Sequence, residues 1–373
     1  MSSPVRVRAT VRVEAVAPEG GEGLLVEFLK AYRDAVQCII DGIWGLEEVP
    51  SRRKLHEVFY GKLRKLGFRA HHVSEIYKRA REVVKAVKEG GGSKPVLRRL
   101  TARVSTYDYR VDFDAKVLRV AVLDDRWVEL KLKLHKHLAR YLDGSWRLGE
   151  VQLSYRGGRI HVYLTFSKEV LLREPRAVMG VDVNFNNITY TIVGLDGNLV
   201  SMGVIPFRGL CRALHLKKLS EELQKRYPRS WRFLKWARSV RSRWLRRARS
   251  ILVDSSHYIA KRLVKVAEEY GAAIALEDLE KLKKNKKNRL SWESHLWCYR
   301  RVQTYVEYKA LVEGIKVVYV DPRGTSKRSP NGKPQVFINY RFAKLGGTTT
   351  TRDVVASWNL ALRGVKADEG LTG

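Results

Sequence analysis

Apolar and polar residues alternate strictly in VRVRATVRV, residues 5–13, which predicts a half-buried β-strand. Apolar residues then recur at helical spacing in three stretches, at about 24–44, 51–66 and 70–89. After a break at GGGSKP the period returns to two, over residues 104–123, 128–134, 151–155 and 160–166. The pattern therefore predicts a β-rich domain, residues 1–20 and 94–173, that carries an inserted helical domain, residues 21–93.

The character of the chain changes near residue 174. Three short runs are almost wholly apolar, as expected for strands that are buried on both faces: AVMGVDVN (177–184), AAIALEDL (272–279) and KVVYVDP (316–322). Residues 188–205 predict two strands joined by a turn at Asp196-Gly197. A long helical region covers about 211–270, and a last helix begins near Asp353. This order predicts an α/β RNase H-like domain over residues 174–373, a mixed sheet with helices on both faces.

The charge of the chain limits its partners. Seventy-two Lys and Arg stand against 39 Asp and Glu, a formal net charge of +33, which a compact fold tolerates best beside a polyanion. Nucleic acid is the favoured polyanion because Lys and Arg contacts to phosphate release counterions. A membrane partner is not expected, since no run of about 18 apolar residues exists. Three scattered cysteines and no signal-peptide pattern favour the cytoplasm.

Three acids stand where the predicted elements would place them at one edge of the sheet. Asp182 lies within the first strand, Glu277 ends the apolar run Ile274-Ala275-Leu276, and Asp353 begins the last helix. A carboxylate in an apolar strand costs several kcal/mol if it is left unpaired, and a divalent cation removes that cost. Mg²⁺, or Mn²⁺, prefers such oxygen ligands. Two ions about 3.5–4 Å apart can hold both oxygens of a phosphodiester displacement. We therefore expect a two-metal site of these three acids.

Each acid also has a structural interpretation. An Asp at a strand edge often pairs with Arg, and Asp353 is a favoured residue type for a helix N-cap. Asp278 competes with Glu277 as a ligand, but strand alternation places only one of the two on the site face, and we favour Glu277. The metal-site hypothesis depends on all three acids together.

The same segments resemble a known family. GVDVNFNNITYTIV resembles the first RuvC motif of the TnpB-type proteins, which OrfB-family insertion sequences encode. IALEDLEKL resembles their second motif, and RDVVASWNLAL, with Asn359, their third. Tyr308-Lys309-Ala310 and the turn Thr325-Ser326 also fit the stretch between the second and third motifs.

The resemblance implies an RNA-guided DNA endonuclease that is related to the type V CRISPR effectors. Its partners would be a guide RNA from the element's own locus and double-stranded target DNA. The β-rich domain would correspond to a barrel-like wedge domain and the helical insertion to a recognition domain. The nuclease domain would carry a basic helical insertion at 206–270. Such a protein grips an RNA–DNA duplex by its backbone.

One departure from the family is clear. TnpB-type proteins usually carry a four-cysteine zinc ribbon before the third motif, but residues 325–352, within the corresponding loop 323–352, contain no Cys and no His. Structural zinc needs four such ligands, so no structural zinc is expected. Either apolar packing replaces the metal, or the ribbon has decayed. The residues that would provide this packing are Val336, Ile338, Tyr340 and Phe342.

Two basic segments are candidate nucleic-acid contacts. The first segment is residues 206–250. Within it, aromatic residues that include Phe233 and Trp236 recur at helical spacing, which favours a core face of a helix over a base-stacking surface. We expect its basic residues to contact the backbone of the guide–target duplex: Arg232, Lys235, Arg238, Arg241, Arg243, Arg246 and Arg247. The second segment, KLKKNKKNRL, is predicted to form a loop that touches phosphate. Its candidate residues are Lys283, Lys284, Lys286 and Lys287.

Three functions remain open at this point. An RNA-guided endonuclease requires the three acids, which are present. A nuclease-impaired, RNA-guided DNA-binding protein or repressor would agree with the missing zinc ribbon. A guide-free RuvC-type junction nuclease would be far shorter. His135-Lys136-His137 has the spacing of a His-x-His metal pair, but the residue between the histidines is not apolar, and a strand edge is the favoured interpretation.

Overall fold

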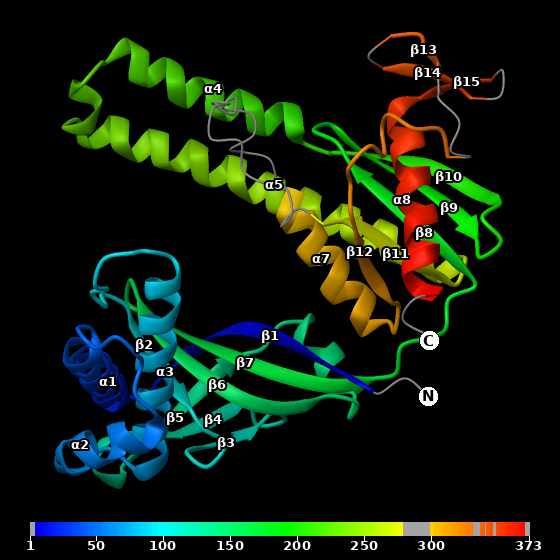
Figure 1. Ribbon diagram of the computed structural model, residues 1–373. Coiled ribbons are helices and arrows are strands. Elements are labelled where there is room, and N and C mark those ends of the chain that lie inside the picture. The colour runs from blue at the N-terminus through cyan, green and yellow to red at the C-terminus, as the bar shows by residue number, and fades with distance from the viewer. Residues whose placement is uncertain (1–3, 279–298, 331–335, 340, 346–347, 370–373) are drawn as a thin grey trace. The chain divides into compact units, whose positions relative to one another are not determined.

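The structure is a computed structural model (Figure 1), and it describes residues 4–278, 299–330, 336–339, 341–345 and 348–369. The chain divides into two compact units, one formed by residues 8–168 and the other by residues 1–7 with 169–373. Among the described residues, no helix combines the length and the apolar character that crossing a membrane requires.

The unit of residues 8–168 combines a sheet with three helices. The helices α1 (Gly21–Ile43), α2 (Arg52–Lys65) and α3 (Ala70–Glu89) follow β1 (Val5–Val16), as the sequence predicted. The remaining strands are β2 (Leu100–Val104), β3 (Tyr109–Asp112), β4 (Val117–Ala121), β5 (Trp127–Lys133), β6 (Arg147–Arg156) and β7 (Arg159–Val170). Their order is β2-β6-β7-β1-β5-β4-β3. Closure of this sheet into a barrel, and the wedge and recognition domain boundaries, stay predictions.

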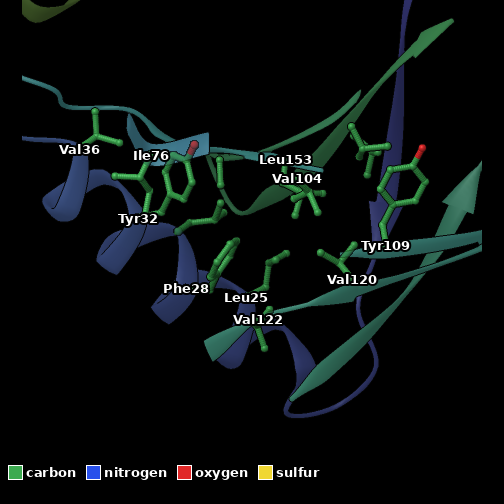
Figure 2. Packing of buried hydrophobic residues seen from close by; sticks show 14 of the residues in the cluster. Leu25, Phe28, Tyr32, Val36, Ile76, Val104, Tyr109, Val120, Val122 and Leu153 are labelled. Atoms are coloured by element: carbon green, nitrogen blue, oxygen red, sulfur yellow. The ribbon is translucent and has the colours of Figure 1, made fainter. Parts of the chain in front are cut away.

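The core of this unit lies between its helices and its sheet. Strand alternation puts every second residue of β1 inward, and the apolar stripe of α1 belongs to the same core, where the helix contacts β2, β5 and β6. Figure 2 shows Phe28 and Tyr32 of α1 beside Ile76 of α3, with Val104 and Leu153 from the sheet. The alternating stretch 104–123 is two strands and a turn, because β3 and β4 pair as a hairpin.

The other unit is built on a mixed sheet. Its strands are β8 (Ala177–Val183), β9 (Asn187–Gly194), β10 (Leu199–Pro206), β11 (Ala272–Glu277) and β12 (Val317–Val320), in the order β10-β9-β8-β11-β12. β11 runs parallel to β8 and β12, whereas β9 is antiparallel to β8 and β10. The predicted order of a strand, a hairpin and two further strands is therefore confirmed.

Helices cover both faces of this mixed sheet. Apolar residues of α5 (Lys235–Glu269) and α7 (Tyr299–Val312) form one core with Met179 and Ile274. Leu360 and Ala361 of α8 (Arg352–Glu369) form a second core with Val178. Neighbouring residues of β8 thus face opposite layers, and the predicted mixed sheet with helices on both faces is confirmed.

α8 approaches β8 closely at Gly180. A β-carbon at this position would lie 2.0 Å from the carbonyl oxygen of Ser357 and 2.3 Å from the amide nitrogen of Ala361. Only glycine permits this contact between the helix backbone and the strand. The contact fixes the face of β8 on which Asp182, two residues further along the strand, is presented.

The long helical region is a hairpin of two helices. α4 (Leu210–Arg226) and α5 lie side by side (Figure 1), with a short 3₁₀-helix, Ser230–Arg232, between them. Pro228 cannot continue α4 because it has no N–H donor, and Arg229 turns the chain with a φ of 65°.

The loop without cysteines contains three short strands: β13 (Val336–Phe337), β14 (Phe342–Leu345) and β15 (Thr348–Thr351). The expectation that apolar packing replaces zinc is wrong for the described residues, because Val336, Ile338 and Phe342 are 65%, 51% and 40% exposed. Tyr340 lies outside the described residues. Backbone pairing of β14 with both neighbours holds this sheet together instead.

Candidate active site

Asp182 and Glu277 come from neighbouring parallel strands. The register pairs Gly180 of β8 with Ala275 of β11, so the two acids, each two residues further on, lie at the same level of the sheet. Ala275 packs in the core beneath α8. Because side chains alternate along a strand, Glu277 and Asp182 both face the side of the sheet that α8 covers.

The same alternation places the side chain of Asp278, the residue after β11, on the opposite face of the sheet, and its backbone N–H donates to the carbonyl of Val320 in β12. Asp278 does not line the pocket that contains Glu277. The geometry agrees with the preference for Glu277, although the role of either residue stays a proposal.

The three predicted acids line one pocket. Asp353 reaches it from the first turn of α8, while Asp182 and Glu277 reach it from the sheet. The pocket has a volume of about 420 Å³. Its other lining residues come from the turn after β12, from β8 and from α8: Asn184, Pro322, Arg323, Thr325, Ser326, Arg352 and Ala356.

Asn184 connects two of the acids. Its side-chain Nδ2 donates to Oδ2 of Asp182 over 2.8 Å, and it also hydrogen-bonds to Asp353. We did not predict a role for this residue from the sequence. A signal was present, because Asn184 lies two positions after Asp182 and such residues share a face of a strand.

Glu277 is held by residues of α7. The hydroxyl of Tyr299 donates to Oε2 of Glu277, and Nε2 of Gln303 donates over 2.9 Å to the backbone carbonyl of Glu277. Tyr299 and Gln303 are buried and lie one helical turn apart. No sequence signal pointed to them, since the contact joins residues that are 22 and 26 positions from Glu277 along the chain.

Burial raises the pKa values of all three acids, and repulsion from the other two carboxylates adds to the shift at Asp182. The pKa of Asp182 rises to about 7, because the carboxyl is buried and because Glu277 and Asp353 repel its charged form. Burial also raises the pKa of Glu277, against the hydrogen bond from Tyr299. For Asp353, burial raises the pKa against the nearby Arg341 and Arg352. Closely spaced acids with raised pKa values are typical of functional sites.

The side chains fit a hard divalent cation by their chemistry. Carboxylate oxygens are its preferred ligands, and a cation would relieve the repulsion that raises the pKa of Asp182. Yet the described residues contain no group of three His, Cys, Asp or Glu side chains that is already arranged around one ion.

α8 also holds the turn that closes the pocket. Nδ2 of Asn359 lies 2.8 Å from the carbonyl of Thr325 and 2.7 Å from that of Arg328. The guanidinium of Arg363 donates to the carbonyls of Asp321 and Arg323. The helix that presents Asp353 thus fixes the position of the turn 321–328.

The predicted basic residues that the structure describes do not line this pocket. Arg232 and Lys235 begin the α5 side of the hairpin, and the others follow along α5: Arg238, Arg241, Arg243, Arg246 and Arg247. All are exposed except Arg241, which is half-buried. Lys283, Lys284, Lys286 and Lys287 lie outside the described residues. The predicted core face is wrong for Phe233 and Trp236, which are exposed.

Comparison with known proteins agrees with this architecture. The family model "Cas12f1-like, TNB domain" matches residues 299–360, a range that includes α7, the turn 321–328 and the loop without cysteines. A TnpB-like protein of Methanocaldococcus jannaschii is 26% identical over 260 residues, 66% of this chain and 91% of that protein. A TnpB-like protein of Aquifex aeolicus is 23% identical, over 61% of this chain and 82% of that protein.

Two further matches are with Cas12f proteins. The CRISPR-associated endodeoxyribonuclease Cas12f2 of a Micrarchaeota archaeon is 32% identical over 88 residues, 22% of this chain and 16% of that protein. The fold resembles Cas12f1 in its cryo-EM complex with sgRNA and target DNA, with a TM-score of 0.65 at 11% identity over 97% of this chain and 99% of that one. The fold is therefore that of a Cas12-type protein. The chain is a TnpB-type relative of the type V CRISPR effectors.

Proposed function

We propose that this protein is a transposon-associated, RNA-guided DNA endonuclease that hydrolyses phosphodiester bonds of guide-paired target DNA. The main support for this proposal is that Asp182, Glu277 and Asp353, from three distant segments of the chain, line one pocket. Burial, together with repulsion from Glu277 and Asp353, raises the pKa of Asp182 to about 7, and keeping this carboxyl charged is a cost for folding. Such a cost is expected where catalysis needs the charge.

The residues of the chain have distinct roles in the proposed reaction. Asp182, Glu277 and Asp353 would hold Mg²⁺ or Mn²⁺, with two ions as the expected number. Asn184 keeps two of these carboxylates oriented, and Tyr299 orients the third. Arg352 and Arg323 add positive charge to the pocket wall, where a phosphate would enter. When bound, the cations would offset charge on the phosphate and favour deprotonation of the attacking water.

The partners of the proposed reaction are a guide RNA from the element's own locus and double-stranded DNA. The names of the relatives support this, because one is an endodeoxyribonuclease and a structural neighbour is bound to sgRNA and target DNA. The exposed arginines of α5 offer phosphate contacts along the hairpin. The missing cysteines leave no ligands for a structural zinc in the loop.

The test begins with purification of the protein from its native locus, followed by sequencing of any bound RNA. A plasmid that carries the guide match is then incubated with the complex and Mg²⁺. We expect cleavage by the wild type, and its loss in Asp182→Ala and Glu277→Gln with RNA binding retained. Asp278→Asn is the matched control, because Asp278 lies on the other face of β11, and it should cut normally.

Each result has one meaning. Absence of bound RNA would contradict the guided mechanism. RNA-dependent DNA binding without cleavage by the wild type would show a nuclease-impaired binding protein or repressor. Normal cleavage by Asp182→Ala would show that the reaction takes place elsewhere on the chain.

A further inference from the structure

The turn between α4 and α5 exposes large aromatic rings. This hairpin tip, residues 226–236, contains Phe233, which is 83% exposed, and Trp236, which is 49% exposed. Exposed rings of this size are costly in water and are enriched where a partner binds. Neither residue contributes to the core beneath α5, so the packing of the unit does not explain them.

Side-chain contacts within the tip involve three of its aromatic rings, those of Tyr227, Trp231 and Trp236. The ring centroids of Tyr227 and Trp236 lie 5.5 Å apart with the planes at 89°, an edge-to-face pair. The guanidinium of Arg241 lies 4.7 Å from the ring centroid of Trp231, and that of Arg232 lies 5.7 Å from it. Trp231 and Trp236 therefore each contact neighbouring side chains of the tip.

Backbone hydrogen bonds fix the same turn. The N–H of Trp231 donates to the carbonyl of Tyr227 over 3.1 Å, and the N–H groups of Phe233 and Leu234 both donate to the carbonyl of Ser230. Arg229 adopts a φ of 65°, a conformation that is uncommon for a residue with a side chain. A surface that is ordered before binding loses little entropy when a partner arrives.

The positive charge around the tip favours an anionic partner. Residues 223–253 contain no Asp or Glu. The same segment carries the following basic residues: Lys225, Arg226, Arg229, Arg232, Lys235, Arg238, Arg241, Arg243, Arg246, Arg247 and Arg249. Aromatic faces among positive charges are the features with which proteins hold single-stranded nucleic acid, since rings stack on bases while Lys and Arg contact phosphates.

We propose that the hairpin tip binds unpaired nucleotides, with Phe233 and Trp236 stacking on the bases and the arginines beside them contacting the phosphates. The proposal extends the proposed function, because a strand displaced from DNA or an unpaired stretch of the guide RNA would supply such bases. It does not require cleavage, and the tip lies outside the pocket of the three acids. The test of the hairpin tip can therefore fail or succeed independently of the cleavage test of the three acids.

The experiment compares two oligonucleotides that differ only in their bases. Full-length Asp182→Ala protein is titrated with a fluorescent 12-nucleotide dT strand and with an abasic strand of the same length and charge. The double variant Phe233→Ala/Trp236→Ala should bind the dT strand roughly 5- to 150-fold more weakly for each stacked base that it loses. Its affinity for the abasic strand, and the salt dependence of binding, should stay unchanged.

Three controls accompany the double variant. Tyr270→Ala removes an exposed ring from the other end of α5 and should change neither affinity. Arg243→Gln/Arg246→Gln should weaken binding of both strands and reduce the salt dependence. Phe233→Ala alone keeps the test valid if the double variant is unstable, because a side chain that is 83% exposed has little part in folding.

If the double variant lost the same affinity for the dT strand as for the abasic strand, the proposal would be overturned. It would also be overturned if the variant lost no affinity for either strand. Two other partners would also overturn it. The tip would be a membrane contact if the double variant no longer bound vesicles of phosphatidylserine and phosphatidylcholine but still bound both oligonucleotides. A change from dimer to monomer in the tip variant, measured by light scattering, would show contact with a second copy.

Discussion

The side-chain amide of Asn359 donates a hydrogen bond of 2.8 Å to the backbone carbonyl of Thr325. The same nitrogen lies 2.7 Å from the carbonyl of Arg328 and 3.1 Å from that of Val355. One amide thus joins the third turn of α8 to a segment whose residues line the acid pocket. The position of the pocket wall relative to Asp353 depends on this amide, because both lie on the same helix.

Replacing Asn359 by alanine should loosen the turn 321–328. The carbonyls of Thr325 and Arg328 lose their donor, which we expect to cost about 1–2 kcal/mol of stability. Cleavage should fall about 10- to 100-fold, as when residues that orient a metal ligand are removed. Hydrogen exchange of the turn should accelerate while that of β11 does not.

Lys366→Ala is the control for Asn359→Ala, because Lys366 lies on the exposed side of the same helix. It should leave both exchange and cleavage unchanged. Unaltered exchange of residues 321–328 in Asn359→Ala would mean that the turn is held by its own contacts, such as the hydrogen bond from Thr325 Oγ1 to the carbonyl of Pro322.

Short-range patterns predicted the framework of the site. Asp182 and Glu277 interrupt apolar runs, and the period of two along a strand placed Glu277, and not Asp278, beside Asp182. The packing of α8 on β8 brings Asp353 to the same pocket. The predicted positions agree with the structure because they use only backbone geometry and the burial of apolar residues, whereas the catalytic roles stay a proposal.

Contacts between distant segments were not predictable in the same way. The spacing of Phe233 and Trp236 fits a helix, but Pro228 ends α4 and α5 begins only at Lys235, so these rings lie in and beside a turn. The alternation around Val336 and Ile338 identifies a strand without showing whether anything covers it. Tyr299 reaches Glu277 only because α7 packs across the sheet.

Tyr299→Phe should weaken cation binding without disturbing the helix. The hydroxyl of Tyr299 stabilises the charged form of Glu277, and its loss should raise the pKa of that carboxyl further. Protons then compete better with the cation. We expect Mn²⁺ affinity to fall about 10-fold at pH 6.5 and less at pH 8.5, measured by calorimetry. Tyr308→Phe, on the same helix, is the control; equal affinities for Tyr299→Phe and wild type would contradict the role of the hydroxyl.

Asp182→Asn should stabilise the protein at high pH in the absence of divalent cations. The carboxyl has a pKa of about 7 in the folded protein against an ordinary value of 3.8, so the folded state binds its proton more tightly. Its contribution to stability is therefore present below about pH 4 and is lost as the pH rises to about 7. At pH 8 the variant should be more stable by roughly 2–4 kcal/mol.

Denaturant unfolding at pH 4 and pH 8 measures this difference between Asp182→Asn and wild type. Excess Mg²⁺ should reduce it, because a bound cation stabilises the wild type. A variant that is less stable than the wild type at pH 8 would show that Asp182 already has a compensating partner.

Gly180→Ala should destabilise the unit that contains the acid pocket. The new β-carbon would meet backbone atoms of Ser357 and Ala361 at 2.0 and 2.3 Å, and backbone cannot rotate away as a side chain can. We expect a loss of about 2–4 kcal/mol. Gly61→Ala is the control, since Gly61 lies within α2 with no atom within 4 Å of the added carbon, and it should gain about 0.5–1 kcal/mol. Denaturant unfolding measures both, and wild-type stability in Gly180→Ala would mean that α8 does not lie this close to β8 in solution.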